Sequence, residues 1–165
     1  MNQHLERLDG MAPFMVKPVM RLIERCQISL GRRLLVVSGY RSAEEQRQKY
    51  QQGRRLVGGV WLIEDELKII TRALPGLTPH NVVTVKDHAP ASVAVDLIPL
   101  FDDGRADWHV SDAFWANLYE LSWKVGLDPL GDEIGAVLKN DKGHFEEPAW
   151  KLKLEGLGLM QPLNT

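Results

Sequence analysis

The chain has 165 residues, of which 44% are apolar and 25% charged, the size and composition of one globular domain. Its net charge of −2 excludes a general nucleic-acid binder, because such a protein needs a basic surface to displace counterions from phosphates. We therefore expect a single domain over residues 1–165, with no nucleic acid as partner.

The cysteine content and the N-terminus indicate the cellular compartment in which the chain is made. The single cysteine, Cys26, excludes an internal disulfide and lies among apolar residues at helical spacing, so we expect a buried thiol. The first ten residues lack the basic start and apolar core of a secretory signal, and no apolar run approaches the ~20 residues that span a bilayer. We expect synthesis in the cytoplasm, no membrane insertion, and a separate exit route for any work outside.

The first third of the chain predicts a helix, a strand and a second helix. Apolar residues at three- and four-residue steps predict a helix over 14–30, with Pro13 and Pro18 in or near its first turn. Residues 33–38 are an apolar, β-branched run and predict a buried strand. A capping box from Ser42 to Glu45 predicts a helix over 43–52. Arg41 thus joins a strand end to a helix start, where it either reaches into a cleft or is a solvated turn residue.

The middle of the chain is rich in β-forming residues. Two runs around the acidic turn 64–66 predict a hairpin within 58–71, and a loop punctuated by Pro and Gly then leads to His80. Residues 82–86 predict a further strand. Residues 93–98 alternate so that Asp96 shares one strand face with Ala94 and Ile98. A carboxylate in so apolar a strand is costly unless it is paired or bound to a metal.

The last third predicts helices on either side of a short strand. Ser111 caps a helix that ends at Gly126, and Pro148 begins a short C-terminal helix. The expected apolar positions of these two helices are Phe114, Leu118, Leu121, Val125, Trp150, Leu152 and Leu154. After an apolar run at 136–138, the stretch 140–146 alternates so that His144 and Glu146 share one face. The mixture of helices and short strands indicates an α+β domain.

Three residues form a possible metal-binding set: His80, Asp96 and His144. Two imidazoles and one carboxylate with an open fourth position are typical of catalytic zinc sites, where the metal activates a water and polarises a carbonyl. Asp141 lies three residues before His144 and is suited to act as general base, while Arg41 can stabilise an oxyanion.

Spacing alone does not select two ligands among the five histidines. His88 is nearer in sequence to Asp96 than His80 is, and Asp87-His88 is itself a polar pair. His4 and His109 fall in a terminus and a loop, so we expect both to face solvent.

Four blocks of the sequence resemble one known family. They are SGYRSAEEQRQKYQQGR (38–54), ITRALPGLTPHN (70–81), ASVAVDL (91–97) and DKGHFE (141–146). In this order they resemble the zinc D,D-carboxypeptidase/endopeptidase family, which includes VanX- and VanY-type D-Ala-D-Ala peptidases and phage L-alanyl-D-glutamate endolysins. The resemblance implies the Hedgehog/DD-peptidase fold, a small central antiparallel sheet flanked by helices.

The resemblance also implies a role for each site residue. His80, Asp96 and His144 would bind zinc, Asp141 would be the general base, and Arg41 would contact the substrate carbonyl. His80 is favoured over His88 because the family's first ligand follows a Ser/Thr-x-His-Asn pattern, which residues 78–81 match. His88 then either touches substrate or lies on the surface.

Three departures from the family pattern affect the substrate pocket. Residues 82–92 are inserted between the first two ligands, the usual Trp-Gly-Gly segment is reduced to Pro129-Leu130-Gly131, and the segment 58–68 is longer than usual.

The function that we expect is that of a zinc metallopeptidase acting on the stem peptide of bacterial peptidoglycan. Within this function we expect a monomeric phage endolysin that leaves the cell through a holin-type pore and cuts the L-Ala–D-Glu bond. The alternatives are a D-Ala-D-Ala carboxypeptidase or dipeptidase, and a non-catalytic zinc-stabilised binding domain.

Overall fold

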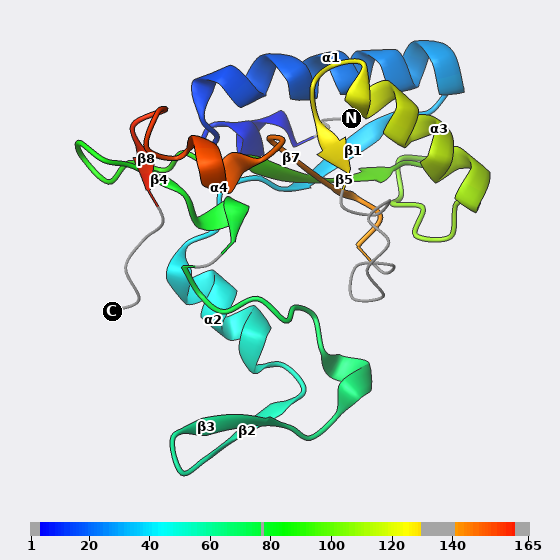
Figure 1. Cartoon of the computed structure of the whole chain (residues 1–165). Helices are drawn as coiled ribbons and strands as arrows, with labels where there is room; N and C mark the ends of the chain where they lie inside the picture. Colours follow the sequence, from blue (N-terminus) through cyan, green and yellow to red (C-terminus); the bar gives the residue numbers. More distant parts are fainter. Residues whose placement is uncertain (1–3, 77, 130–140, 161–165) are drawn as a thin grey trace.

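The computed structural model describes residues 4–76, 78–129 and 141–160. A four-stranded antiparallel sheet of order β1-β5-β7-β6 carries α1 and α3 on one face (Figure 1). This arrangement confirms the expected α+β fold with a small central antiparallel sheet. The apolar runs at 136–138 and the positions Leu130 and Gly131 lie outside the described residues. Among the described helices, none is long and apolar enough to cross a membrane.

The sheet is built from short strands whose register fixes which side chains meet. Its strands are β1 (Leu34–Ser38), β5 (Ala94–Pro99), β7 (His144–Glu146) and β6 (Asp128–Pro129). In β5 every residue is buried except Asp96, which is half-buried. The pairing of β1 with β5 shifts register between Val36 and Ser38, so Val37 occupies a β-bulge. Such bulges re-aim side chains beside functional sites.

Helix α1 (Pro13–Leu30) covers the sheet and confirms the predicted helix. Its buried residues include Val19, Ile23 and Cys26, and it ends at Gly31, whose φ of 66° is the left-handed conformation that favours glycine. Pro18 lies inside the helix rather than in its first turn, a position at which it removes one backbone hydrogen bond. Burial of the residues around Pro18 maintains the helix there.

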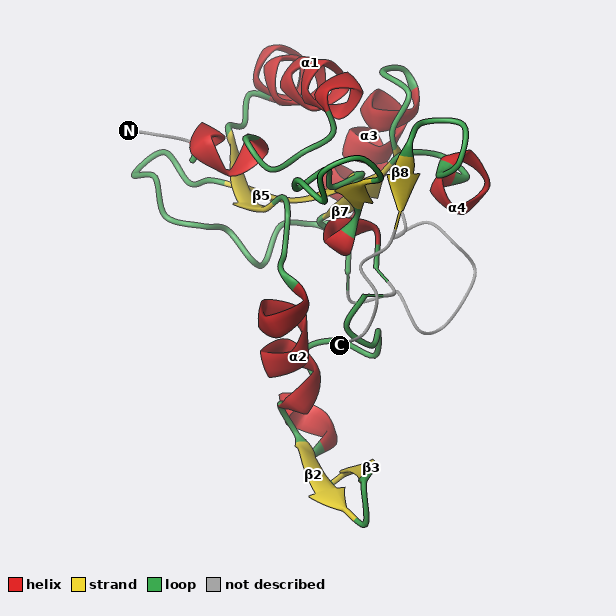
Figure 2. Ribbon diagram, turned by 90° about the vertical axis from the view of Figure 1, so that its left-hand side faces the viewer, coloured by secondary structure: helices red, strands yellow, loops and turns green. Residues whose placement is uncertain are grey.

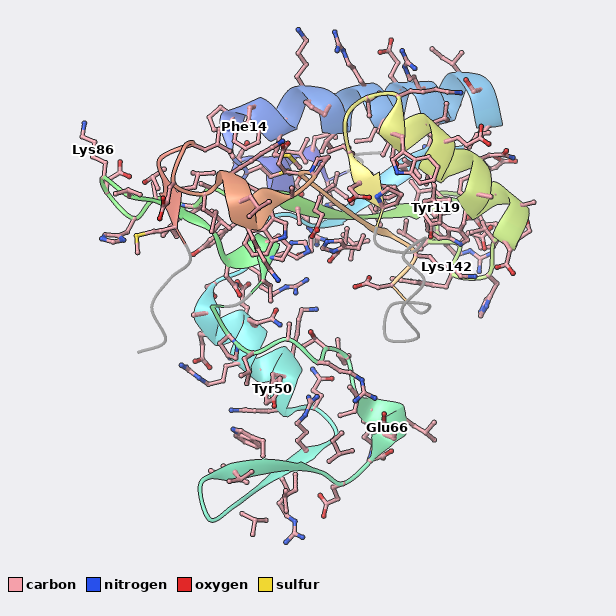
Figure 3. All side chains as sticks on the ribbon, viewed as in Figure 1. Phe14, Tyr50, Glu66, Lys86, Tyr119 and Lys142 are labelled. Atoms are coloured by element: carbon pink, nitrogen blue, oxygen red, sulfur yellow. The ribbon has the colours of Figure 1, made fainter. Side chains whose placement is uncertain are left out.

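Helix α3 (Asp112–Trp123) is capped by Ser111 as predicted, but its buried face differs from the predicted one. Trp115, Leu118 and Tyr119 are buried, whereas Phe114 and Leu121 are only partly covered. The large aromatic rings decide the rotation, because Tyr119 packs edge-on against Phe145 of β7 at 6.1 Å between ring centroids. Figure 3 shows Tyr119 beside Lys142, whose carbonyl accepts a hydrogen bond from the tyrosine hydroxyl.

Helix α2 (Ala43–Gln51) and the hairpin of β2 (Arg54–Val57) and β3 (Val60–Ile63) extend away from the sheet (Figure 2). The capping box at Ser42 forms as predicted. The predicted hairpin around 64–66 is wrong in register, since the strands turn at Gly58-Gly59 and residues 66–68 form a 3-10 helix. Both glycines have positive φ, which the tight turn requires.

The C-terminal part packs against the segment inserted after His80. Strand β4 (Val83–Thr84), a fragment of the predicted strand 82–86, pairs with β8 (Leu159–Met160). Helix α4 (Trp150–Lys153) is shorter than predicted. It buries Trp150. Leu152, which was expected among the apolar positions of this helix, is 88% exposed and does not belong to the core.

Candidate metal centre

The sheet places Asp96 and His144 side by side. They are directly opposite each other in the β5–β7 pairing, and Ser38 of β1 is opposite Asp96 on the other side. Residues paired across strands project from the same sheet face, so the three side chains form one row. On the opposite face Phe145 is fully buried in the core. The predicted alternation of 144–146 is therefore observed.

His80 reaches the same place from a 3-10 helix, Pro79–Asn81, outside the sheet. The Arg41 amide donates to the His80 carbonyl at 3.0 Å, and the Asn81 side chain donates to the carbonyl of Arg41. The side-chain oxygen of Asn81, Oδ1, in turn accepts from the Thr78 hydroxyl at 2.9 Å. These contacts fasten the loop that carries His80 to the turn that carries Arg41.

Three ligand atoms converge on one point. Asp96 Oδ1 lies 3.2 Å from His80 Nε2 and 3.2 Å from His144 Nδ1, and the two imidazole nitrogens are 3.3 Å apart. Ligands at the about 2.0–2.1 Å Zn–N distance of a tetrahedral site lie about 3.3 Å from one another. The nearly equilateral triangle therefore has the dimensions of one face of a zinc tetrahedron, and the residues present fit this ion.

The second nitrogen of each imidazole has its own partner, which fixes the tautomer. His80 Nδ1 lies 2.6 Å from the Gly39 carbonyl oxygen, and His144 Nε2 lies 3.1 Å from Glu146 Oε2. Both partners only accept hydrogen bonds, so in the neutral rings these nitrogens donate and the other two direct their lone pairs to the point at which the three ligand atoms converge. Acceptor partners of this kind orient metal-binding histidines.

The centre favours a positive charge. Burial opposes the charged form of His144, but hydrogen bonds to Asp96 and Glu146 outweigh it and raise its pKa to about 10. Burial likewise opposes ionisation of Asp96, yet the charges and hydrogen bonds of His80 and His144 hold the pKa of Asp96 well below its usual range. Asp96 lies between the two imidazoles, and Glu146 lies behind His144. A proton or a divalent cation can neutralise the negative charge of these two carboxylates.

Arg41 lies against the centre with only 11% of its side chain exposed. Its Nη2 donates to the second carboxylate oxygen of Asp96 and to the Ser38 hydroxyl, both at 3.1 Å. Its Nη1 donates to Gln46 Oε1 at 2.8 Å, whereas Nε is buried and no described residue accepts a hydrogen bond from it. Arg41 thus orients Asp96 in addition to facing the cleft, so the alternative of a solvated turn residue is wrong.

Asp141 is the exposed member of the group. Partial desolvation and the negative charge of Asp96 raise the pKa of Asp141, while His144, His80 and Arg41 oppose the rise. Its carbonyl accepts from the amide of His144 at 3.1 Å. The carboxyl group therefore lies within electrostatic reach of the whole centre while remaining open to solvent.

Sequence patterns missed one supporting residue, Gln46, which is fully buried and anchors Arg41. Glu146, predicted on the same face as His144, is buried behind it. A polar residue on the inner face of α2, four residues after its capping serine, was the signal for Gln46. The three other histidines, His4, His88 and His109, are exposed.

Two depressions meet at Asp96 and Val37, the bulge residue. One has about 620 Å³ and is lined by charged side chains, including Arg7, Arg41 and Lys49. The other has about 360 Å³ and is lined by Trp108, Val110, Trp115, Asp141, Lys142 and residues of β5. We call them the polar arm and the aromatic arm. Together they form a cleft that continues on both sides of the candidate metal centre.

Comparison with known proteins finds similar proteins only among solved structures. No protein-family model and no curated protein matches the chain. The L-Ala D-Glu endopeptidase ChiX of Serratia marcescens is similar over 89% of this chain and 87% of its own, with a TM-score of 0.53 and 17% identity. The vancomycin-resistance D,D-pentapeptidase VanY, in complex with Zn(II), is similar over 89% and 78%, with a TM-score of 0.55 and 17% identity.

A third similar structure is the LD-carboxypeptidase LdcB, which matches over 94% of this chain and 78% of its own, with a TM-score of 0.53 and 20% identity. The chain therefore has the fold of these peptidases, as the sequence resemblance predicted. At these identities the likeness concerns the fold, and the function has to be argued from the centre itself.

Proposed function

We propose that the chain is a zinc-dependent metallopeptidase that cleaves the stem peptide of bacterial peptidoglycan. The observation that carries the proposal is the triangle of Asp96, His80 and His144, flanked by a general base candidate and a buried cation. A purely structural zinc site is closed by four protein ligands, whereas the described part of the chain supplies three here, at the edge of the two arms. The solved structures of similar fold include peptidases of this class.

Each residue has a role that its surroundings support. His80, Asp96 and His144 would hold the ion, and a zinc ion there lowers the pKa of a water to about 7 and polarises the scissile carbonyl. Asp141 would take the proton of the attacking water and deliver it to the leaving amine, a use that its raised pKa favours. Arg41 would hold Asp96 in place and counter negative charge that develops on the carbonyl oxygen.

The test of catalysis is Asp141→Asn, which keeps the shape of the side chain and removes the base. We expect the wild type with zinc to release peptides from purified cell wall and the variant to lose about 100-fold or more of this rate. Zinc content, measured by mass spectrometry, should be unchanged in the variant. Equal rates would exclude Asp141 as the base. A wild type that binds zinc but never digests wall would favour a non-catalytic binding domain.

Within this class we propose an L-Ala–D-Glu endopeptidase. An endopeptidase must accept chain on both sides of the scissile bond, and the two arms that meet at Asp96 supply this space. The D-Ala-D-Ala carboxypeptidase is the second candidate, because cations of the polar arm could hold a terminal carboxylate. Mass spectrometry of digested muropeptides separates the two. Loss of terminal D-Ala alone would overturn the endopeptidase.

We further propose that the enzyme serves as a phage endolysin, a role that the sequence resemblance supports. Added from outside to permeabilised Gram-negative cells, it should lower turbidity within minutes. Produced inside intact cells, it should lyse them only when a holin-type pore is produced too. Lysis without such a pore would contradict this role and leave the peptidase proposal intact.

A further inference from the structure

The aromatic arm presents a tryptophan that the chemistry at the metal centre does not use. Trp108 is 66% exposed although it lines the depression next to Asp96 and Asp141. Trp115, only 5% exposed, and the half-buried Val110 line the same depression. Leaving a large indole exposed forgoes the burial that stabilises a fold, so an exposed tryptophan in a cleft is a candidate ligand contact.

The loop that carries Trp108 is held firmly on both sides of it. The Asp107 side chain is buried, pairs with Arg32, and accepts from the His109 amide at 3.1 Å. The Asp107 amide donates to the Pro99 carbonyl at the end of β5, at 2.8 Å. The backbone that carries the exposed indole is therefore fixed at the depression, which lowers the entropy cost of ordering this loop when a ligand binds.

The two arms differ in the chemistry that they can recognise. In the polar arm, Arg7, Arg41 and Lys49 line the space together with three acidic residues. Of these, Glu45 is engaged in the capping box of α2, Glu6 pairs with His4, and Asp96 pairs with Arg41. Such a surface fits carboxylates. The aromatic arm fits a ligand with a flat apolar face and a polar edge, because an indole offers the same combination.

We propose that Trp108 is a platform for an N-acetylated sugar of the glycan strand to which the stem peptide is attached. This inference rests on the proposed peptidase function and assigns the aromatic arm to the sugar and the polar arm to the acidic residues of the stem. A pyranose ring has a flat face of C–H groups with hydroxyl and acetamido groups at its edge, which matches the indole. The stem peptide itself offers alanine methyls and carboxylates, and recognition of these groups does not require two indole rings.

The spacing within the substrate agrees with this assignment. In peptidoglycan only a lactyl group and one alanine separate the sugar from the L-Ala–D-Glu bond. At about 3.3–3.6 Å per extended unit they place the sugar about 7 Å from the scissile bond, in the arm adjoining Asp96. For a D-Ala-D-Ala bond at least three more residues intervene, so the sugar would lie more than about 15 Å away and could not reach Trp108 in the same pose.

The experiment compares two substrates that carry the same acylated peptide, one with and one without the sugar. One is the disaccharide-peptide released from wall by a muramidase. The other is the peptide freed by an amidase, with its L-Ala amine then acylated with lactate so that no new charge lies beside the scissile bond. Rates are measured for the wild type, Trp108→Ala and Trp108→Phe. Trp123→Ala is the matched control, because Trp123 is also exposed (50%) but lines neither arm.

We expect the wild type to prefer the disaccharide-peptide by about three- to tenfold in kcat/KM, as one stacking contact allows. Trp108→Ala should abolish this preference by raising KM for the disaccharide-peptide. Trp108→Phe should keep most of the preference, and Trp123→Ala should keep all of it. A wild type without preference, or a Trp108→Ala variant that loses the same factor on both substrates at unchanged thermal stability, would overturn the platform.

Binding measurements separate this inference from the proposed function. Calorimetry on the Asp141→Asn variant gives the affinities for both substrates without turnover. Tighter binding of the disaccharide-peptide that depends on Trp108, with no cleavage by the wild type, would support the platform and refute the peptidase. Cleavage of the L-Ala–D-Glu bond with equal affinity for both substrates would support the peptidase and refute the platform.

Discussion

Replacing Gln46 by methionine tests how the position of Arg41 is maintained. Gln46 is fully buried on the inner side of α2 and receives Arg41 Nη1 at 2.8 Å. Its own Nε2 donates to the Ala73 carbonyl at 2.9 Å and to the Thr71 hydroxyl at 3.3 Å. Methionine has nearly the same length and volume as glutamine, so Gln46→Met removes these hydrogen bonds without opening a large cavity.

The expected loss follows from these contacts. Arg41 Nη1 and the Ala73 carbonyl would be left without their partner, at about 1–3 kcal/mol for each group that remains buried, and better burial of the apolar side chain returns about 1 kcal/mol. We therefore expect a decrease of about 3 kcal/mol in the free energy of unfolding. For a chain of 165 residues this corresponds to about 6–12 °C in Tm.

Urea denaturation followed by circular dichroism measures the free energy of unfolding. Gln48→Met is the matched control, because Gln48 lies on the exposed side of the same helix. We expect the control to stay within about 0.5 kcal/mol of the wild type. If Gln46→Met does so too, the hydrogen bond that Gln46 accepts from Arg41 and the one it donates to Ala73 contribute nothing to stability, and Gln46 does not anchor Arg41.

Three further changes test the remaining parts of the structure. His80→Ala should lose bound zinc by mass spectrometry and His88→Ala should keep it, so the reverse result would exclude His80 as ligand. Burial raises the pKa of the Cys26 thiol to about 12. The unfolded chain loses this proton first, near pH ~8.5. The stabilisation from the protonated thiol is therefore complete below that pH and declines as the pH rises toward 12. A thiol reagent should label the folded protein at pH 7 only after denaturant is added, and rapid labelling without denaturant would contradict this burial. A Cβ at Gly143 would lie 2.4 Å from the Leu97 carbonyl oxygen, so Gly143→Ala should lower the free energy of unfolding by about 1–3 kcal/mol. Gly156→Ala, with no close neighbour nearer than 3.8 Å, should leave it almost unchanged, and equal effects of the two substitutions would refute the steric argument.

Local signals in the sequence were sufficient for the elements that depend on local chemistry. The capping box at Ser42, the glycine after α1 and the alternation around His144 all predict features that the structure contains. The three candidate ligands were found from residue type and family resemblance, and the fold brings them together. Residue type and spacing alone left the choice among the five histidines open, and the resemblance selected His80.

Tertiary packing decided what the local signals did not. The rotation of α3 follows from Trp115 and Tyr119 packing toward the sheet, which no periodicity within the helix reveals. The predicted hairpin differs from the observed one for two reasons. β-branched residues continue past the end of β3, and the turn Gly58-Gly59 directly precedes a β-forming run, so the sequence predicts a strand start there. Gln46 was missed because its partners are 5 and 27 residues away in the chain.

The hairpin of β2 and β3 has a practical consequence for engineering. Its tip, Gly58-Gly59, has no atom within 4 Å of where a Cβ would stand, and Figure 1 shows it at the far end from the sheet. Exposed tips of this kind tolerate inserted sequence, so a wall-binding peptide or a fluorescent domain can be fused there. The return segment at Thr71 and Ala73 is a poor site for the same fusion, because Gln46 ties it to Arg41.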